Sequence, residues 1–375
     1  MLLEGFTAPC APAEPLRDSV WHGQLQLLAG LPYPLLAMAP AIAASLRCGL
    51  RADFATLGIC DGETLAPTAF WAERIDEPVL HWLSGHTQAL FDVTPLGEQL
   101  ATDGDAVRAC FGAPGWSEHP VYRAAFAPLG ARWGMAVPLL DRAHRCLGFV
   151  YVYRSEAAGP FTDDEQQRLR AARDRLRGLG APHAPCADAG GRTVPTRTAL
   201  LRIDAQGRIR ARSANAYELL FIGQHQRVGS LAWAAPDLSA LPSSVATRCH
   251  RLLADPGHAP VDEITLHADG GGMRYQLQRL VCEGADGAEL VVRLCHLEPL
   301  DLAVARQLIH WPLTPRERQL AVASARASGQ REMAQMLGCS VGTLKGYLHS
   351  LYAKVGVTTR EALINRLLGS CTAKA

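Results

Sequence analysis

The strongest constraint on how this chain folds lies near its C-terminus, where helix-start signals follow one another at short intervals. Thr314 precedes a proline and stands three residues before Glu317, so a capping threonine, a proline at the first helical position and a capping-box glutamate coincide. Ser340 is a similar cap for a later helix, which Gly356 ends. Together the signals predict four helices, over 315–327, 329–338, 341–355 and 360–368. Because only Cys339 and Ser340 separate the second helix from the third, we expect a helix-turn-helix.

The third of these helices divides into an apolar face and a face suited to DNA. Its apolar residues recur at helical spacing and are expected to pack on the other helices: Leu344, Leu348, Leu351 and Val355. The opposite face carries Gly342, Lys345, Gly346, His349 and Ala353. Small residues allow a helix to approach a major groove closely, and Lys345 and His349 can donate hydrogen bonds to base edges. Thr343 and the first amides of the helix suit phosphate oxygens.

Four sequence blocks in this region resemble the LuxR/GerE family of DNA-binding domains. They are Leu313-Thr-Pro-Arg-Glu-Arg, Glu332-Met-Ala-Gln-Met-Leu-Gly, Ser340-Val-Gly-Thr-Leu-Lys and Lys354-Val-Gly-Val. The resemblance implies an all-α four-helix domain over 311–371, whose third helix reads the major groove and whose fourth supports dimerisation. It places the base-facing positions on Lys345, Gly346 and His349, and the backbone-contacting positions on Gln330, Arg331, Thr343 and Lys354.

The chain departs from the family pattern at its glycines. Gly342 and Gly346 replace larger residues, and each glycine weakens a helix by roughly 1 kcal/mol relative to alanine. His349 stands where a lysine or another polar residue is common. Affinity for DNA is therefore expected to depend more on dimerisation or on a partner.

Residues 20–180 are expected to form an α+β sensor domain. Phe54–Cys60 and Leu65–Trp71 flank the turn dipeptide Asp61-Gly62, and a second strand pair is predicted over 134–140 and 146–153. Thr162 and Glu165 form a capping box for a helix over 163–179. This region resembles a GAF domain in three blocks, Met135-Ala-Val-Pro-Leu-Leu-Asp, Leu147-Gly-Phe-Val-Tyr-Val-Tyr and Phe161-Thr-Asp-Asp-Glu.

A stretch rich in proline and glycine, 181–197, is predicted to be a linker to a second α+β domain over 198–300. Leu201-Arg-Ile-Asp-Ala-Gln-Gly-Arg-Ile followed by Asn215-Ala resembles a PAS domain. Further strands are predicted over 274–281 and 289–297, with Gly270-Gly271-Gly272 at a hairpin tip.

Charge and cysteine distribution are typical of a cytoplasmic regulator. From Leu313 onward the chain has nine basic and three acidic residues, a net charge of +6. Because the net charge of the whole chain is +1, that of the first 312 residues is −5. A basic end on an acidic body indicates a polyanionic partner at that end. The eleven cysteines include no C-x-x-C pair and are an odd number, which favours reduced thiols in the cytoplasm.

One segment is long and apolar enough to be considered as a membrane span. Ser19–Leu46 contains no charged residue. It also contains prolines at 32, 34 and 40, which break or bend a helix, so we expect a buried helix around Leu35–Leu50 with a proline-interrupted entry, and no membrane partner.

These observations together predict a transcriptional regulator that binds double-stranded DNA as a homodimer and responds to a small-molecule effector or a protein partner. Contact with RNA polymerase is compatible with this role. No enzymatic activity, cofactor or metal is expected, because no nucleophile–base pair, ligand spacing or phosphate-binding loop is recognisable. Two alternatives stay open: an enzyme that a DNA-binding tail localises, and an autoinducer-type receptor.

Overall fold

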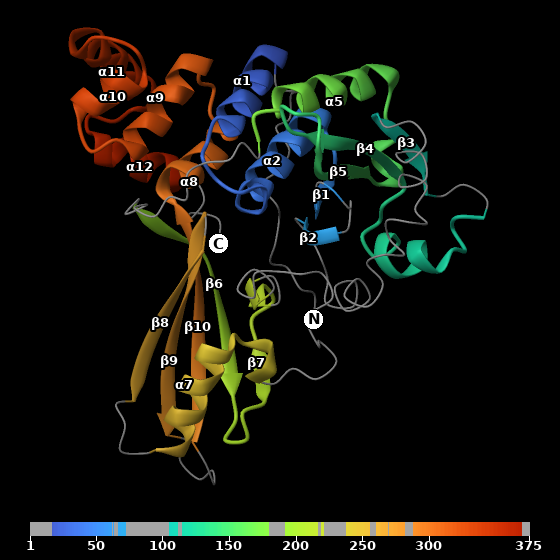
Figure 1. The fold of residues 1–375 in the computed structure, drawn as a ribbon, viewed down its shortest axis with the longest axis vertical. Helices are drawn as coiled ribbons and strands as arrows, with labels where there is room; N and C mark the ends of the chain where they lie inside the picture. The colour runs from blue at the N-terminus through green and yellow to red at the C-terminus, as the bar shows by residue number, and fades with distance from the viewer. Residues whose placement is uncertain are drawn as a thin grey trace.

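The fold is taken from a computed structural model. It describes residues 17–61, 63, 67–72, 105–111, 115–179, 192–216, 219–220, 238–255, 260–268, 270–281 and 288–369. These residues form two antiparallel sheets and nine α-helices, a multidomain α+β arrangement (Figure 1). Leu65, where a strand is predicted to begin, lies outside the described residues.

The first unit, residues 17–179, is built on a five-stranded antiparallel sheet in the order β2-β1-β5-β4-β3. The strands are β1 (Phe54–Cys60), β2 (Pro67–Ala72), β3 (Val107–Cys110), β4 (Trp133–Leu140) and β5 (Cys146–Arg154). The predicted strand pairs β1–β2 and β4–β5 are confirmed by their registers. Asp141 closes the β4–β5 turn by accepting hydrogen bonds from the backbone of Ala143 and Arg145. Strand β3 was not predicted.

Helices α2 (Leu35–Leu50) and α5 (Asp163–Arg175) pack on this sheet, and α1 (Asp18–Ala29) packs on both of these helices (Figure 1). The apolar segment Ser19–Leu46 lies in α1 and α2, which are separated by a short break that ends at Pro34. The indole N–H of Trp21 in α1 donates to the carbonyl of Ser45 in α2 at 2.8 Å. The capping box of Thr162 and Glu165 is present, as predicted. Within the described residues, no helix is long and apolar enough to cross a membrane.

The second unit, residues 192–299, repeats the same strand order in a sheet β7-β6-β10-β9-β8. Its elements are β6 (Thr193–Ile203), β7 (Ile209–Arg212), α7 (Ser243–Ala254), β8 (Val261–Ala268), β9 (Gly271–Val281) and β10 (Ala288–Pro299). Residues 193–197, predicted to belong to the linker, pair with β10 instead. Gly270, with φ +89°, lies at the tip of the β8–β9 hairpin, as expected.

The C-terminal unit, residues 311–369, consists of four helices: α9 (Pro315–Arg326), α10 (Gln330–Met336), α11 (Val341–Val355) and α12 (Arg360–Gly369). Shorter helical turns occur elsewhere, at Tyr122–Phe126 (π), Glu156–Ala158, Leu238–Ala240 and Leu308–His310 (3-10).

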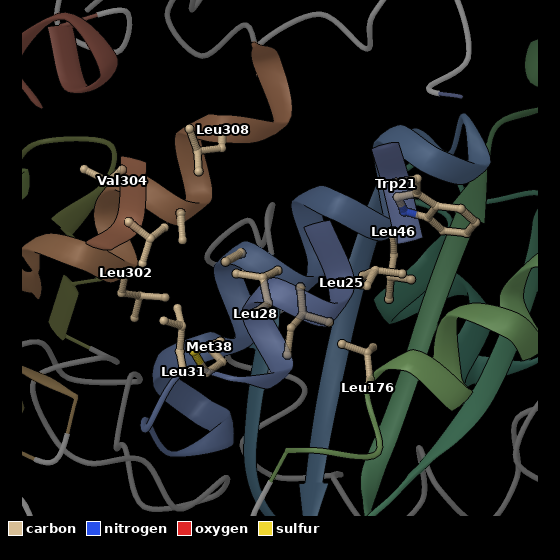
Figure 2. Packing of buried hydrophobic residues seen from close by; sticks show 14 of the residues in the cluster. Trp21, Leu25, Leu28, Leu31, Met38, Leu46, Leu176, Leu302, Val304 and Leu308 are labelled. Atoms are coloured by element: carbon tan, nitrogen blue, oxygen red, sulfur yellow. The ribbon is translucent and has the colours of Figure 1, made fainter. Parts of the chain in front are cut away.

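Helix α8 (Leu300–Gln307) joins the units. It follows β10 directly and packs against α1, α2, α9 and α12. One continuous apolar core therefore extends from the first unit through α8 into the C-terminal helices, and Figure 2 shows Leu28, Leu302 and Leu308 within it. The second unit has a separate core, centred on residues such as Leu277 and Val292.

Candidate nucleic-acid interface

The turn between α10 and α11 has the local geometry that the sequence predicts. Gly338 takes φ +60°, a conformation that glycine adopts without strain, and reverses the chain after α10. The hydroxyl of Ser340 accepts the backbone N–H of Thr343 at 3.1 Å and so caps α11. Gly356, at φ +75°, ends the helix in a left-handed conformation. Helices α10 and α11 thus form a helix-turn-helix.

The apolar face of α11 is buried as predicted. Leu344 and Leu351 have no exposed surface, and Leu348 and Val355 are each 6% exposed. Together they bury the inner side of the helix against α9, α10 and α12. This packing fixes which residues α11 presents to solvent.

All seven residues predicted to contact DNA are exposed. They are Gln330, Arg331, Thr343, Lys345, Gly346, His349 and Lys354. Lys345, Gly346 and His349 lie on the outward side of α11, and a Cβ added at Gly346 would meet no atom within 4 Å. Gln330 and Arg331 begin α10. The structure therefore presents these residues at the surface of the helix-turn-helix, where a nucleic acid has access to them.

Lys354 differs from Lys345 because it has an intramolecular partner. Its ammonium lies 2.9 Å from a carboxylate oxygen of Glu317 in the first turn of α9. Burial raises the pKa of Glu317, but the backbone N–H of Thr314 and the Lys354 ammonium outweigh this effect and hold the pKa below its ordinary value. A phosphate that binds Lys354 would therefore compete with Glu317.

Arg316 is a further residue of this surface that the sequence did not single out. Its guanidinium donates to the carbonyl of Leu337, in the turn between α10 and α11, at 2.8 Å. It also lies over the ring of Tyr347 on α11, 5.6 Å from the ring centroid. Arg316 thus connects the first helix of the unit to both parts of the helix-turn-helix. Its position in the sequence, directly before the capping-box residue Glu317, did not indicate these contacts.

Arg318 fixes the C-terminal unit on the first unit. It has no exposed surface and donates three hydrogen bonds: to the carbonyl oxygens of Leu313 (3.0 Å) and Trp311 (2.8 Å), and to the side-chain oxygen of Gln24 in α1 (2.7 Å). Gln24 in turn donates to the carbonyl of Ala305 in α8 at 2.7 Å. Burial lowers the pKa of Arg318 to about 10, so it remains protonated at neutral pH. One buried polar network therefore spans α1, α8 and α9.

No group of three or more His, Cys, Asp or Glu side chains suited to a metal occurs among the described residues. Cys295 and His296 are adjacent on β10, where the ring of His296 is 3.3 Å from the hydroxyl of Thr196.

Neither protein-family models nor curated proteins match the chain. Among solved structures, the N-acylhomoserine lactone-dependent LuxR-family transcription factor CepR2 of Burkholderia cenocepacia is 21% identical, covers 42% of this chain and 90% of its own, and has a TM-score of 0.31. VqmA of Vibrio cholerae, solved with ligand and DNA, is 14% identical, with 48% and 86% coverage and a TM-score of 0.23.

PelD of Pseudomonas aeruginosa matches a larger share of the chain, 78%, and 83% of its own length, at 15% identity and a TM-score of 0.27. LuxR-family regulators are thus among the structural neighbours, but the scores are too low to carry an argument.

Proposed function

We propose that this protein is a sequence-specific, DNA-binding transcriptional regulator of the LuxR/GerE type, with α11 as its recognition helix. The observation that carries the proposal is the outward face of α11. It combines Lys345, Gly346 and His349 on a helix whose other side is buried, directly after a tight turn from α10. A helix of this kind fits a major groove, and its polar side chains can meet base edges while Gln330, Arg331 and Thr343 meet phosphates.

The excess of positive charge supports the same proposal. The exposed basic side chains of the C-terminal unit are Arg316, Arg326, Arg331, Lys345, Lys354 and Arg366. Two of the three acids are engaged locally, since Glu317 binds Lys354 and Glu332 accepts hydrogen bonds from Ser328. The unit therefore presents a net positive surface to a polyanion.

Selection of genomic DNA fragments by the full-length protein tests this function, with the variant Lys345→Glu beside it at the same, near-physiological salt concentration. We expect the wild type to enrich fragments that share a motif and the variant to lose this enrichment. The matched control is Arg251→Glu, which makes the same charge change at an exposed site on α7. Because non-specific phosphate binding depends on overall charge, the control variant separates base recognition from electrostatic attraction.

Retention of the motif by Lys345→Glu would overturn the assignment of the reading face. Absence of any shared motif with the wild type, both with and without a cell extract that supplies effectors, would overturn the function itself.

We also propose that the first unit is a GAF-like sensor and the second a PAS-like one, in a cytoplasmic homodimer that responds to a small molecule or a protein partner. The shared strand order of the two sheets, each with helices packed on it, supports a common sensory architecture. The face of α11 that is proposed to read DNA is already exposed in this structure, so an effector would not act by uncovering it. Regulation is therefore expected to change the spacing of two recognition helices in a dimer, by moving the junction of α1, α8 and α9.

A further inference from the structure

Two cysteines of the first unit lie side by side at one end of its sheet. Cys60 ends β1 and Cys146 begins β5, and the two strands are neighbours. Their sulfur atoms are 3.8 Å apart, and the thiol of Cys60 points toward both the sulfur and the carbonyl of Cys146. Both are free thiols. Because the two cysteines are 86 positions apart in the chain, it is the fold that brings them together.

Local irregularities of the sheet bring the thiols together. The register of β1 with β2 shifts between Ile59 and Cys60, and that of β4 with β5 shifts at Cys146. Gly148 then allows β5 to approach β1 unusually closely, since a Cβ at this position would lie 2.1 Å from the carbonyl oxygen of Gly58. The close approach is thus built into the backbone beside the pair.

The two thiols differ in access and in acidity. Cys60 is 7% exposed, whereas Cys146 is half-buried. A hydrogen bond from the Cys60 thiol, opposed by partial burial, lowers the pKa of Cys146 to about 7. The same hydrogen bond, together with burial and the charges of Cys146 and Asp61, raises the pKa of Cys60. Cys146 is therefore the thiol that ionises first and that solvent reaches.

We propose that Cys60 and Cys146 form an oxidant-sensitive dithiol that hydrogen peroxide converts to an intramolecular disulfide. The Cys146 thiolate attacks one peroxide oxygen, the O–O bond breaks, and the leaving hydroxide takes up the thiol proton as water, which leaves a sulfenic acid. The Cys60 sulfur then attacks the sulfenic sulfur; the S–O bond breaks, the second hydroxide leaves with the Cys60 proton as water, and the S–S bond forms. Two thiols lose two electrons and two protons, and one peroxide becomes two water molecules.

The movement that the second step requires is small. The sulfur atoms must come together from 3.8 Å to the bond length of about 2.0 Å, which side-chain rotation on adjacent strands can provide. A disulfide of this kind in a reducing compartment is transient, as expected for a redox-sensing pair and not for a structural one.

Peptide mapping of the full-length protein tests the proposal. The reduced protein is treated with hydrogen peroxide, the remaining thiols are alkylated, and the product is cleaved with trypsin. Cleavage after Arg51, Arg74, Arg145 and Arg154 releases peptides 52–74 and 146–154, each with one cysteine. We expect these two peptides to be joined, with the loss of two hydrogen atoms, and to separate again on reduction.

Variants assign the two roles. In Cys60→Ser, the Cys146 sulfenic acid should persist and be trapped by dimedone, whereas Cys146→Ser should give neither the sulfenic acid nor the link. Cys110→Ser is the matched control, since Cys110 is a half-buried cysteine on β3 of the same sheet, and it should leave the link intact. The wild-type map decides the proposal even if a variant fails to fold. Peroxide treatment that leaves both peptides unlinked, or that oxidises Cys110 as fast as Cys146, would overturn it.

Discussion

At the scale of single residues, Arg318 shows most clearly what the sequence conceals. The residue belongs to the block Leu313-Thr-Pro-Arg-Glu-Arg, whose helix-start signals are readable from spacing alone, and the structure confirms the capping box of Thr314 and Glu317. The partner Gln24 lies 294 residues away in a segment that reads only as apolar helix. Local spacing encodes caps because their hydrogen bonds are local, whereas a buried contact between distant helices leaves no periodic trace.

Replacement of Arg318 tests this junction. Arg318→Met fills much of the same volume but leaves the oxygen atoms of Leu313 and Gln24 without donors, whereas the carbonyl of Trp311 keeps the backbone N–H of Leu313. Each unsatisfied buried acceptor costs about 1–3 kcal/mol, and relief of the buried charge offsets part of this, so we expect a net loss of about 2 kcal/mol in the free energy of unfolding. Urea unfolding of the full chain measures it. The exposed Arg326, on the same helix, provides the control Arg326→Met, which should change the free energy by less than about 0.5 kcal/mol.

A double variant shows whether the loss of stability comes from the hydrogen bond between Arg318 and Gln24 or from the substitution of Arg318 alone. Gln24→Leu removes one of the acceptors that Arg318→Met leaves unsatisfied. Because the two side chains share a hydrogen bond, the double variant should be more stable than the sum of the single losses implies, by at least about 0.5 kcal/mol. Strict additivity would show that the bond between them contributes nothing.

At the scale of elements, helices with strong boundary residues and strands with regular alternation could be predicted closely. Helix α2 and strand β1 have the predicted bounds, and α11 ends where Gly356 predicts. The four-residue strand β3 was missed because so short a segment carries no periodic pattern. The start of β6 was missed because Pro195 and its neighbours read as a linker, although they pair with the end of β10.

Two glycines, one inside α11 and one at its C-terminal cap, give opposite predictions. Gly346 lies in the helix interior with open space around the position of a Cβ, so Gly346→Ala should raise the free energy of unfolding by about 1 kcal/mol. Gly356 ends the helix at φ +75°, so Gly356→Ala should lower it by about 1 kcal/mol. Thermal unfolding of the two variants beside the wild type checks both signs. A loss of stability in Gly346→Ala would mean that the outward face of α11 is covered.

At the scale of the whole molecule, the hydrophobic cores of the described residues do not divide along the three predicted domains: one core spans the first and C-terminal units, another lies within the first unit, and a third lies in the second unit. The core that contains Leu308 extends from the C-terminal helices through α8 into α1 and α2 (Figure 2). The sequence could not show this shared core, because the apolar residues of α8 would suit packing against the second unit as well as against the C-terminal unit. Because the C-terminal unit shares its core with the first unit, a change in the packing of one can reach the other, as the proposed regulation by an effector requires.

Calorimetry of the full-length chain tests the division into cores. Leu308→Ala and Leu277→Ala each remove a fully buried side chain, the first from the core shared by the first and C-terminal units and the second from the core of the second unit. Each should cost about 2–5 kcal/mol of local stability. We expect two transitions, with Leu308→Ala lowering the midpoint of only one and Leu277→Ala that of only the other. If both variants shift the same transition by similar amounts, the chain unfolds as one cooperative unit, and movement at α8 would then reach the second unit as directly as it reaches the C-terminal helices.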